Sequence, residues 1–387
     1  DTTRTFNLQY HFRQGLPDVV TLSQFFKNNG YYAARVGKIY HYGNPGEIGT
    51  DGLDDAPSWT EKFNPAGRDK TVLEPEIIRL SKGGLGSSIS LLADKTGRDE
   101  EHTDGMVADQ TIRLLEAQKD KPFFIAAGFY KPHCPYVAPQ KYFDLYPLEK
   151  ITLPEVADGF RKTVPGPALA STNPWPYLGV TSDEARQGKQ AYYATISFVD
   201  AQIGRVLSAL DRLGLRDNTV VVFWSDHGYL LGEHGMWMKQ SCFEESARVP
   251  LIIAPPKAKS AGQSSPRTVE LLDIYPTLVD IAGLTPPAHL QGASLRPLLD
   301  NPQTAWNRPA FTQVQRGNFP GHSVRTERWR YTEWDGGEKG SEFYDHDNDP
   351  QELKNLADNP QFADVQAQMK TLIKANHPTR VQGGKAN

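Results

Sequence analysis

The chain has 387 residues, with 42 Lys and Arg against 46 Asp and Glu, which gives a net charge of −4. This length is sufficient for one large α/β domain and a smaller one. The near balance of charge disfavours bulk binding to nucleic acid or a membrane surface, so an anionic ligand must be held by a local cluster. No apolar run approaches the roughly 20 residues that cross a bilayer, so we expect no membrane span.

The first part of the chain predicts a helix, a strand and a long irregular segment. Apolar residues at helical spacing predict a helix over 19–29 that stops at Gly30. A short strand that enters a loop is expected within residues 31–41. Residues 44–100 are rich in Gly, Pro, Asp and Ser and have weak periodicity. They predict a long, ordered insertion or lid.

A second helix and strand are expected next. Asp104 is predicted to cap a helix over residues 105–118. The sequence KPFFIAAGFY (121–130) is a nearly continuous apolar run, which is typical of a strand buried in a parallel sheet. A proline-rich stretch over residues 132–177 then interrupts the pattern.

The alternation of helices and strands continues beyond the proline-rich stretch. A long amphipathic helix is predicted over 183–214, followed by strands over 219–226 and 249–255 and a helix over 269–283. Strands that alternate with helices in this way predict an α/β fold with a doubly wound, mostly parallel sheet.

The character of the sequence changes after about residue 303. Residues 322–334 and 342–349 are expected to form short antiparallel strands, and a helix is expected near 361–375. We therefore predict a catalytic α/β domain over residues 1–303. A small C-terminal α+β subdomain is predicted over residues 304–387.

Charged residues follow three of the predicted strands, at the edge where ligands gather in an open parallel sheet. Each residue alone has an ordinary explanation, such as a packed lysine stem or an aspartate that caps a turn. The chain has only ten histidines, however, so a histidine at each strand end favours a shared site. The residues concerned are Lys38 and His41 after the first strand, Lys131 and His133 after the second, and Asp226 and His227 after the third, with Lys239 beyond.

These residue types suit the hydrolysis of a sulfate or phosphate ester. Asp226 and His227 can ligate a divalent cation, but Ca²⁺ takes about 6–8 oxygen ligands, so further acidic ligands must come from elsewhere. Lysines are point charges that suit a tetrahedral oxyanion, and a nearby histidine can protonate a leaving oxygen.

Several segments resemble those of the sulfatases, within the alkaline-phosphatase superfamily. The resemblance covers nearly the whole chain and is closest to the iduronate-2-sulfatases and their bacterial relatives. It is carried by GKIYH, GFYKPHCPY, FWSDHGYLLGEHGMWMK, RVPLIIAPP, LLDIYPTLVDIAGL and FYDHDNDPQELKNLAD. It implies an alkaline-phosphatase-like α/β fold, Ca²⁺ as cofactor, and a sulfated sugar or another small sulfate ester as substrate.

The resemblance also implies a role for each matched residue. Asp226 and His227 would ligate Ca²⁺. Lys38 and Lys239 would bind the sulfate oxygens. His133 would contact the sulfate and assist departure of the alcohol. His41 would hydrogen-bond the nucleophile. Tyr229, Leu231 and Trp237 would lie near the sugar pocket, and Lys131 is a neighbour without a matched role.

The sequence departs from the family at the nucleophile. Sulfatases use a formylglycine made from Cys or Ser in a C/S-x-P-x-R motif, and neither Cys134, Cys242 nor any serine here has that context. We therefore expect the chain to begin just downstream of its active centre, without the first strand of the sheet. The chain would then be a fragment, the partner of a separate N-terminal polypeptide, or a degenerate relative. These 387 residues alone are expected to show no turnover.

Two other functions stay open at this point. One is a phosphoesterase of the same superfamily with zinc in the metal site. The other is a non-catalytic protein that binds sulfated glycans through Lys38, His133 and Lys239.

The two cysteines and the glycosylation pattern bear on the setting of the protein. Cys134 and Cys242 could form a disulfide, two free thiols or a pair near a site, and free, partly buried thiols are favoured. No N-x-Ser/Thr sequence occurs, which favours a bacterial protein. We expect a periplasmic or secreted location, with the signal outside this sequence.

Overall fold

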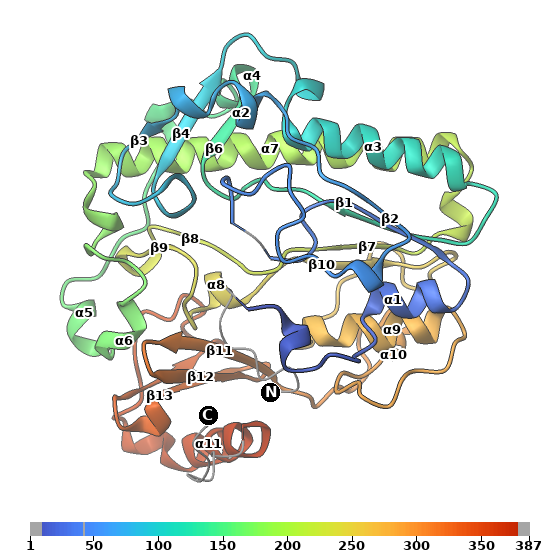
Figure 1. The fold of residues 1–387 in the computed structure, drawn as a ribbon. Helices are drawn as coiled ribbons and strands as arrows, with labels where there is room; N and C mark the ends of the chain where they lie inside the picture. Colours follow the sequence, from blue (N-terminus) through green and yellow to red (C-terminus); the bar gives the residue numbers. More distant parts are fainter. Residues whose placement is uncertain (1–9, 42, 378–387) are drawn as a thin grey trace. The chain divides into compact units, whose positions relative to one another are not determined.

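The computed structural model describes residues 10–41 and 43–377 (Figure 1). The chain divides into two compact units. The described part of the N-terminal unit comprises residues up to 153 together with 176–219. The described part of the C-terminal unit comprises residues 154–175 and 220–377. None of the described helices is both long and apolar enough to cross a membrane.

A parallel sheet forms the centre of the N-terminal unit. Strand β1 (Tyr32–Gly37) lies between β2 (Glu61–Phe63) and β5 (Phe123–Gly128) and pairs in parallel with both. Helices α1 (Leu22–Asn28) and α3 (Thr103–Gln118) pack against this sheet. β1 is buried at all but its first position, as expected for the middle strand of a covered parallel sheet. The predicted helix–strand order and the parallel pairing are confirmed.

A second sheet of the N-terminal unit joins the irregular segment to the proline-rich stretch. Its order is β3 (Ile78–Arg79), β4 (Ser90–Asp94) and β6 (Tyr136–Pro139), and the pairing of β4 with β6 is parallel. The long helix α7 (Ser182–Arg212) packs along β4 and β6 (Figure 1). Residues 44–100 therefore contribute strands to both sheets of the unit, and their action as a lid stays a prediction.

Asp104 does not cap helix α3, so this prediction was wrong. The helix begins after His102, whose side chain makes no capping bond, and Asp104 lies buried in the first turn. Its carboxylate accepts the backbone N–H of Tyr130 at 2.8 Å and of Lys131 at 2.9 Å. Burial raises the pKa of Asp104 to about 6, although Lys131 opposes the shift. The carboxylate therefore ties α3 to the segment that follows β5.

The C-terminal unit begins its sheet structure with β7 (Val221–Trp224). This strand pairs antiparallel with β10 (Leu251–Ala254), so this pair departs from the mostly parallel arrangement. Between them, β8 (Leu230–Leu231) and β9 (Trp237–Met238) form a short antiparallel pair. The shorter α-helices of the C-terminal unit are α5 (Phe160–Thr163), α6 (Gly166–Leu169), α8 (Glu244–Ala247), α9 (Ile274–Ile281) and α10 (Arg296–Asp300). Two further short α-helices, α2 (Arg68–Thr71) and α4 (Gln140–Phe143), belong to the N-terminal unit.

The last part of the chain is an antiparallel sheet covered by a helix, as predicted. The strands follow in sequence order and comprise β11 (Ala310–Arg316), β12 (Phe319–Arg325), β13 (Trp329–Trp334) and β14 (Ser341–Asp345). Helix α11 (Ala363–Asn376) buries Met369 and Ile373 against Val324, Tyr331 and Phe343 of this sheet (Figure 1).

The apolar core of the C-terminal unit extends across residue 303. Leu230, Met236 and Phe243, from the segment after β7, share one buried cluster with Trp334 and Tyr344 of the antiparallel sheet. The predicted domain boundary at residue 303 stays a prediction. The segment after β7 nevertheless packs directly on the C-terminal strands.

Neither cysteine forms a disulfide in the described part of the chain and both are buried, in agreement with the thiols that the sequence favours. Cys134 is 2 % exposed and Cys242 is 3 % exposed. Burial raises the pKa of the Cys242 thiol to about 12, so this thiol stays protonated and unreactive at neutral pH.

Candidate active site

Two glycines determine the position of Lys38 in the N-terminal unit. Gly37 and Gly128 are the last residues of β1 and β5 and lie opposite each other in the sheet. A Cβ atom on Gly37 would lie 2.2 Å from the carbonyl oxygen of Gly128, and Gly37 has a φ of +73°, so only glycine fits. Because the strands approach so closely, the backbone N–H of Lys38 donates to the Gly128 carbonyl at 3.0 Å. Lys38, which is half-buried, therefore lies at the shared carboxyl end of both strands.

The segment after β5 carries His133 in a defined tautomer. His133 Nδ1 lies 2.7 Å from the carbonyl oxygen of Cys134, and a carbonyl only accepts, so Nδ1 carries the proton. The lone pair of the neutral ring is then on Nε2, which is the atom that can exchange a proton with a ligand. The ammonium of Lys131 is buried and donates to the Pro135 carbonyl at 2.9 Å, which agrees with a supporting rather than a catalytic role. His41 is exposed and follows the end of β1.

Asp226 and His227 follow β7 in the C-terminal unit and form a partly exposed pair. The side chain of Asp226 is 61 % exposed and that of His227 is 32 % exposed. His227 Nδ1 donates to the Gly228 carbonyl at 2.8 Å, which places the lone pair on Nε2. That Nε2 lies 3.6 Å from Asp226 Oδ2. Two ligands about 2.1–2.5 Å from one cation lie roughly 3–3.7 Å apart, so this pair suits two adjacent coordination positions.

The turn after His227 is anchored to helix α8. The backbone N–H of Gly228 donates to Ser246 at 2.9 Å and that of Tyr229 donates to Glu245 at 2.7 Å. A Cβ on Gly228 would lie 2.0 Å from the Glu245 carbonyl oxygen, so this contact requires glycine. Tyr229 is half-buried. The position of the Asp226–His227 pair therefore depends on the position of α8.

Lys239 follows a strand that is held through its backbone. The Thr172 hydroxyl accepts the N–H of Trp237 at 2.9 Å and donates to its carbonyl at 3.1 Å. The Trp237 side chain is fully buried, so the structure offers no exposed ring surface there, and its predicted contact with a sugar stays an untested prediction. Leu231 is also buried, and Lys239 is half-buried.

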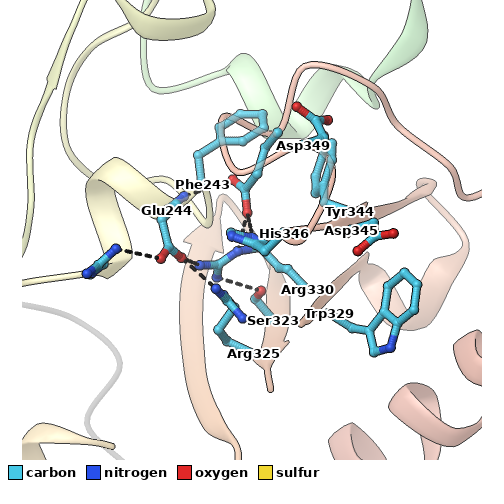
Figure 2. A network of polar contacts seen from close by, with 12 residues as sticks. Phe243, Glu244, Ser323, Arg325, Trp329, Arg330, Tyr344, Asp345, His346 and Asp349 are labelled. Atoms are coloured by element: carbon cyan, nitrogen blue, oxygen red, sulfur yellow. Dashed lines mark hydrogen bonds and ion pairs between the residues drawn. The ribbon is translucent and has the colours of Figure 1, made fainter. Parts of the chain in front are cut away.

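Helix α8 is joined to the antiparallel sheet by a buried charge network that sequence reasoning missed. Figure 2 shows Glu244 of α8 pointing toward Arg325 and Arg330, and both arginines form ion pairs with it. Arg330 Nε also lies 2.5 Å from Glu352 Oε1, and His346 Nε2 lies 2.9 Å from the same oxygen. Burial alone would raise the pKa of Glu352, but Arg330 and His346 outweigh it and hold the pKa at about 2. No local motif signals these contacts, because they join segments far apart in sequence.

Comparison with known proteins assigns the chain to a family. Residues 3–284 match the family model "Sulfatase", and residues 232–378 match "N-sulphoglucosamine sulphohydrolase, C-terminal". A sulfatase of Formosa agariphila is 32 % identical over 94 % of this chain and 70 % of its own length. The iduronate 2-sulfatase of Homo sapiens is 31 % identical, over 94 % of this chain and 81 % of its own length.

A solved structure shows the same fold. A phosphonate monoester hydrolase from Silicibacter pomeroyi matches with a TM-score of 0.77 at 20 % identity, over 97 % of this chain and 82 % of its own. The fold is therefore the alkaline-phosphatase-like α/β fold. Within this fold class, the chain belongs to the sulfatase family and is a sulfuric ester hydrolase by descent.

Proposed function

We propose that the chain provides the anion-binding and metal-binding residues of a sulfatase that acts on a sulfated sugar, with a specificity like that of iduronate 2-sulfatase. The main support is the pairing of His227 Nε2 and Asp226 Oδ2 at 3.6 Å, in a chain 31 % identical to human iduronate 2-sulfatase. The proposal goes beyond family membership, because identity at this level does not determine the sugar or the sulfate position.

The proposed roles follow the charge of each side chain. Lys38 and Lys239 bind the sulfate oxygens, because compact ammonium groups suit a tetrahedral oxyanion. His133 contacts the sulfate and, in its imidazolium form with a proton on Nε2 as well as on Nδ1, delivers the Nε2 proton to the departing alcohol oxygen. His41 hydrogen-bonds the nucleophile, and Tyr229 lies beside the sugar. Lys38, His41 and His133 belong to one compact unit and Lys239 to the other, so their joint action on one sulfate is part of the proposal.

Asp226 and His227 are proposed to hold part of a calcium site. The Nδ1 proton of His227 is committed to the Gly228 carbonyl, which directs the Nε2 lone pair to a ligand. A bound Ca²⁺ would supply positive charge beside the sulfate oxygens. Two ligands fall short of the about 6–8 that Ca²⁺ takes, so further carboxylates must complete the site.

The nucleophile is the part of the family's machinery that these 387 residues do not contain. No Cys-x-Pro-x-Arg or Ser-x-Pro-x-Arg occurs among them. In the family this motif gives a formylglycine, whose hydrate attacks the sulfur. We therefore propose that these residues bind a sulfate ester but need a nucleophile from another segment of polypeptide for turnover. We also propose a bacterial, periplasmic or secreted setting, on the sequence grounds given above.

Calorimetry tests the anion site apart from turnover. A 2-O-sulfated uronate is titrated into the 387-residue chain in Ca²⁺, and into Lys239→Ala. We expect the substitution to weaken binding about 10–100-fold, since a charge-assisted hydrogen bond contributes about 1.5–3 kcal/mol. Lys259→Ala is the control, because this lysine is 73 % exposed and pairs only with Asp300 among the described residues. Equal affinity of Lys239→Ala and the parent chain would contradict the proposal.

An activity assay separates the remaining alternatives. The same chain is incubated with a chromogenic aryl sulfate and with the matching aryl phosphate, in Ca²⁺ and in Zn²⁺. We expect no turnover of either ester above the rate in buffer. Turnover of the phosphate in Zn²⁺ would indicate a phosphoesterase. Turnover of the sulfate would show that these residues contain their own nucleophile.

A further inference from the structure

A second group of potential metal ligands lies within the C-terminal unit, apart from Asp226 and His227. His234, Glu245 and Glu352 each offer one ligand atom, and these atoms all lie within 4.8 Å of one another. His234 comes from the turn between β8 and β9, Glu245 from α8, and Glu352 from the segment after β14. We call these three residues the buried histidine–glutamate cluster. None of its three residues belongs to the proposed calcium site.

The cluster contains buried polar atoms without partners. The His234 side chain is 1 % exposed, and neither of its ring nitrogens has a hydrogen-bond partner among the described residues. The Oε2 atom of Glu245 is also buried and lacks a hydrogen bond, while the side chain as a whole is 26 % exposed. Burying such groups without a partner costs about 1–3 kcal/mol each, so native proteins normally satisfy them with protein, water or an ion. The atoms without hydrogen bonds therefore belong to two residues that approach each other in this cluster.

The imidazole of His234 is held rigidly in this orientation. It stacks on Phe243 at a centroid distance of 4.0 Å and on Phe160 at 5.0 Å. Its backbone has a φ of +56°, a region that few non-glycine residues adopt. Nε2 lies 3.6 Å from Glu245 Oε2, which is too long for a hydrogen bond. It is close to the spacing of roughly 3.4 Å between two ligands of a tetrahedral cation with bonds of about 2.1 Å.

Charge also favours a cation at this place. Glu352 is compensated by Arg330 and His346 through Oε1, while its Oε2 accepts one bond, from the Glu244 backbone at 2.8 Å. An acceptor position therefore remains on Glu352 Oε2. Glu245 has no lysine or arginine partner among the described residues. The neighbouring group of Glu244, His346 and Glu352 is less suited, because two arginines already neutralise Glu244.

We propose that the buried histidine–glutamate cluster binds one structural zinc-type divalent cation. One imidazole nitrogen and two carboxylate oxygens are a donor set that Zn²⁺ accepts, with a water as fourth ligand, whereas Ca²⁺ prefers more oxygen ligands. The ion would clamp the turn at His234 to α8 and to the segment after β14. Because α8 also anchors the turn at Gly228 and Tyr229, the clamp would hold the Asp226–His227 pair in position.

The test uses chains that carry Asp226→Asn, so that the proposed calcium site does not contribute. These chains are dialysed against chelator and then against Zn²⁺, and bound zinc is measured by elemental analysis and by calorimetry. We expect one zinc per chain in the Asp226→Asn background. Addition of Glu245→Gln should weaken zinc binding at least 10-fold. Glu233→Gln is the matched control, because Glu233 lies beside His234 but bonds the Leu231 backbone instead.

Thermal unfolding shows whether a variant loses zinc binding because it is misfolded. In the absence of zinc, Glu245→Gln and its parent should melt within a few degrees of each other. Saturating zinc should raise the Tm of the parent and of Glu233→Gln by several degrees and leave that of Glu245→Gln unchanged. Equal zinc affinity of parent and Glu245→Gln, or no retained zinc in the parent, would overturn the proposal. The latter result would mean that water fills the cluster. Neither result depends on sulfatase activity.

Discussion

Two histidine–carboxylate pairs of the C-terminal unit have the same spacing and opposite surroundings. His227 and Asp226 lie 3.6 Å apart with side chains 32 % and 61 % exposed. His234 and Glu245 also lie 3.6 Å apart, but the histidine side chain is 1 % exposed. Water can solvate the first pair, whereas in the second pair Glu245 is 26 % exposed and the buried imidazole must be satisfied from within the protein. Although the two pairs have the same spacing, the difference in exposure suits the first pair to exchange ligands with solvent and the second to stabilise the fold.

Among the buried charged residues of the C-terminal unit, we expect Arg330 to contribute most to the stability of the fold. Arg330→Ala would leave Glu244 and Glu352 without their main buried counter-charge, and we expect it to lower the free energy of unfolding by about 3–5 kcal/mol. Urea denaturation measures the change, and Lys259→Ala, which breaks an exposed pair, should shift stability by no more than about 0.5 kcal/mol. Similar losses in both variants would mean that burial does not distinguish the two kinds of charge.

A buried carboxyl that forms no ion pair with an arginine of the described residues should respond to pH in the opposite way to Glu352. Burial raises the pKa of Glu342 to about 7, although Trp334 and Tyr344 donate to it at 2.8 Å and 2.9 Å. Between about pH 4.5 and 7 the folded chain keeps this proton while the unfolded chain loses it, so Glu342 lowers stability as pH rises, by about 3 kcal/mol.

Unfolding free energies at pH 5 and pH 8 measure this effect in the parent chain and in Glu342→Gln. The substitution should remove most of the stability loss between the two pH values. Glu352, with its pKa lowered to about 2, should lose its contribution only as pH falls from about 4.5 toward 2. A parent and a Glu342→Gln variant with the same pH dependence would contradict the raised pKa.

The smallest expected effects compare the two pairs directly in metal-free protein. Asp226→Asn should change stability by less than about 0.5 kcal/mol, because its carboxylate is largely solvated. Glu245→Gln should be neutral or stabilising by up to about 1 kcal/mol, since it removes a carboxylate charge whose buried Oε2 atom has no hydrogen bond. Chelator-treated chains in urea provide the measurement. A strong loss for Glu245→Gln without metal would mean that the His234–Glu245 pair is already satisfied.

Local patterns predicted much of the fold, and they supplied the residues of the candidate site, whose roles stay predictions. The strand ends at Lys38, His133 and Asp226 follow from apolar runs that stop at polar or glycine residues. The role of Asp104 was mispredicted because a short-range pattern cannot distinguish a capping carboxylate from one that accepts the N–H groups of Tyr130 and Lys131. Trp237 is fully buried, and its predicted place beside the substrate stays a prediction, since a hydrophobic residue near a motif looks the same in sequence whether it lines a pocket or a core.

The sequence by itself determined the order of helices and strands, the family and the identity of the charged residues, because periodicity, turn residues and motifs are all read over short stretches of chain. Only the tertiary structure decided that Glu245 and Glu352 meet His234, and that Glu244 meets Arg330. Those contacts join residues separated by many elements, and 108 positions separate Glu244 from Glu352. These charged groups are buried only once the shared core has formed, and burial is what gives their interactions a large effect on stability.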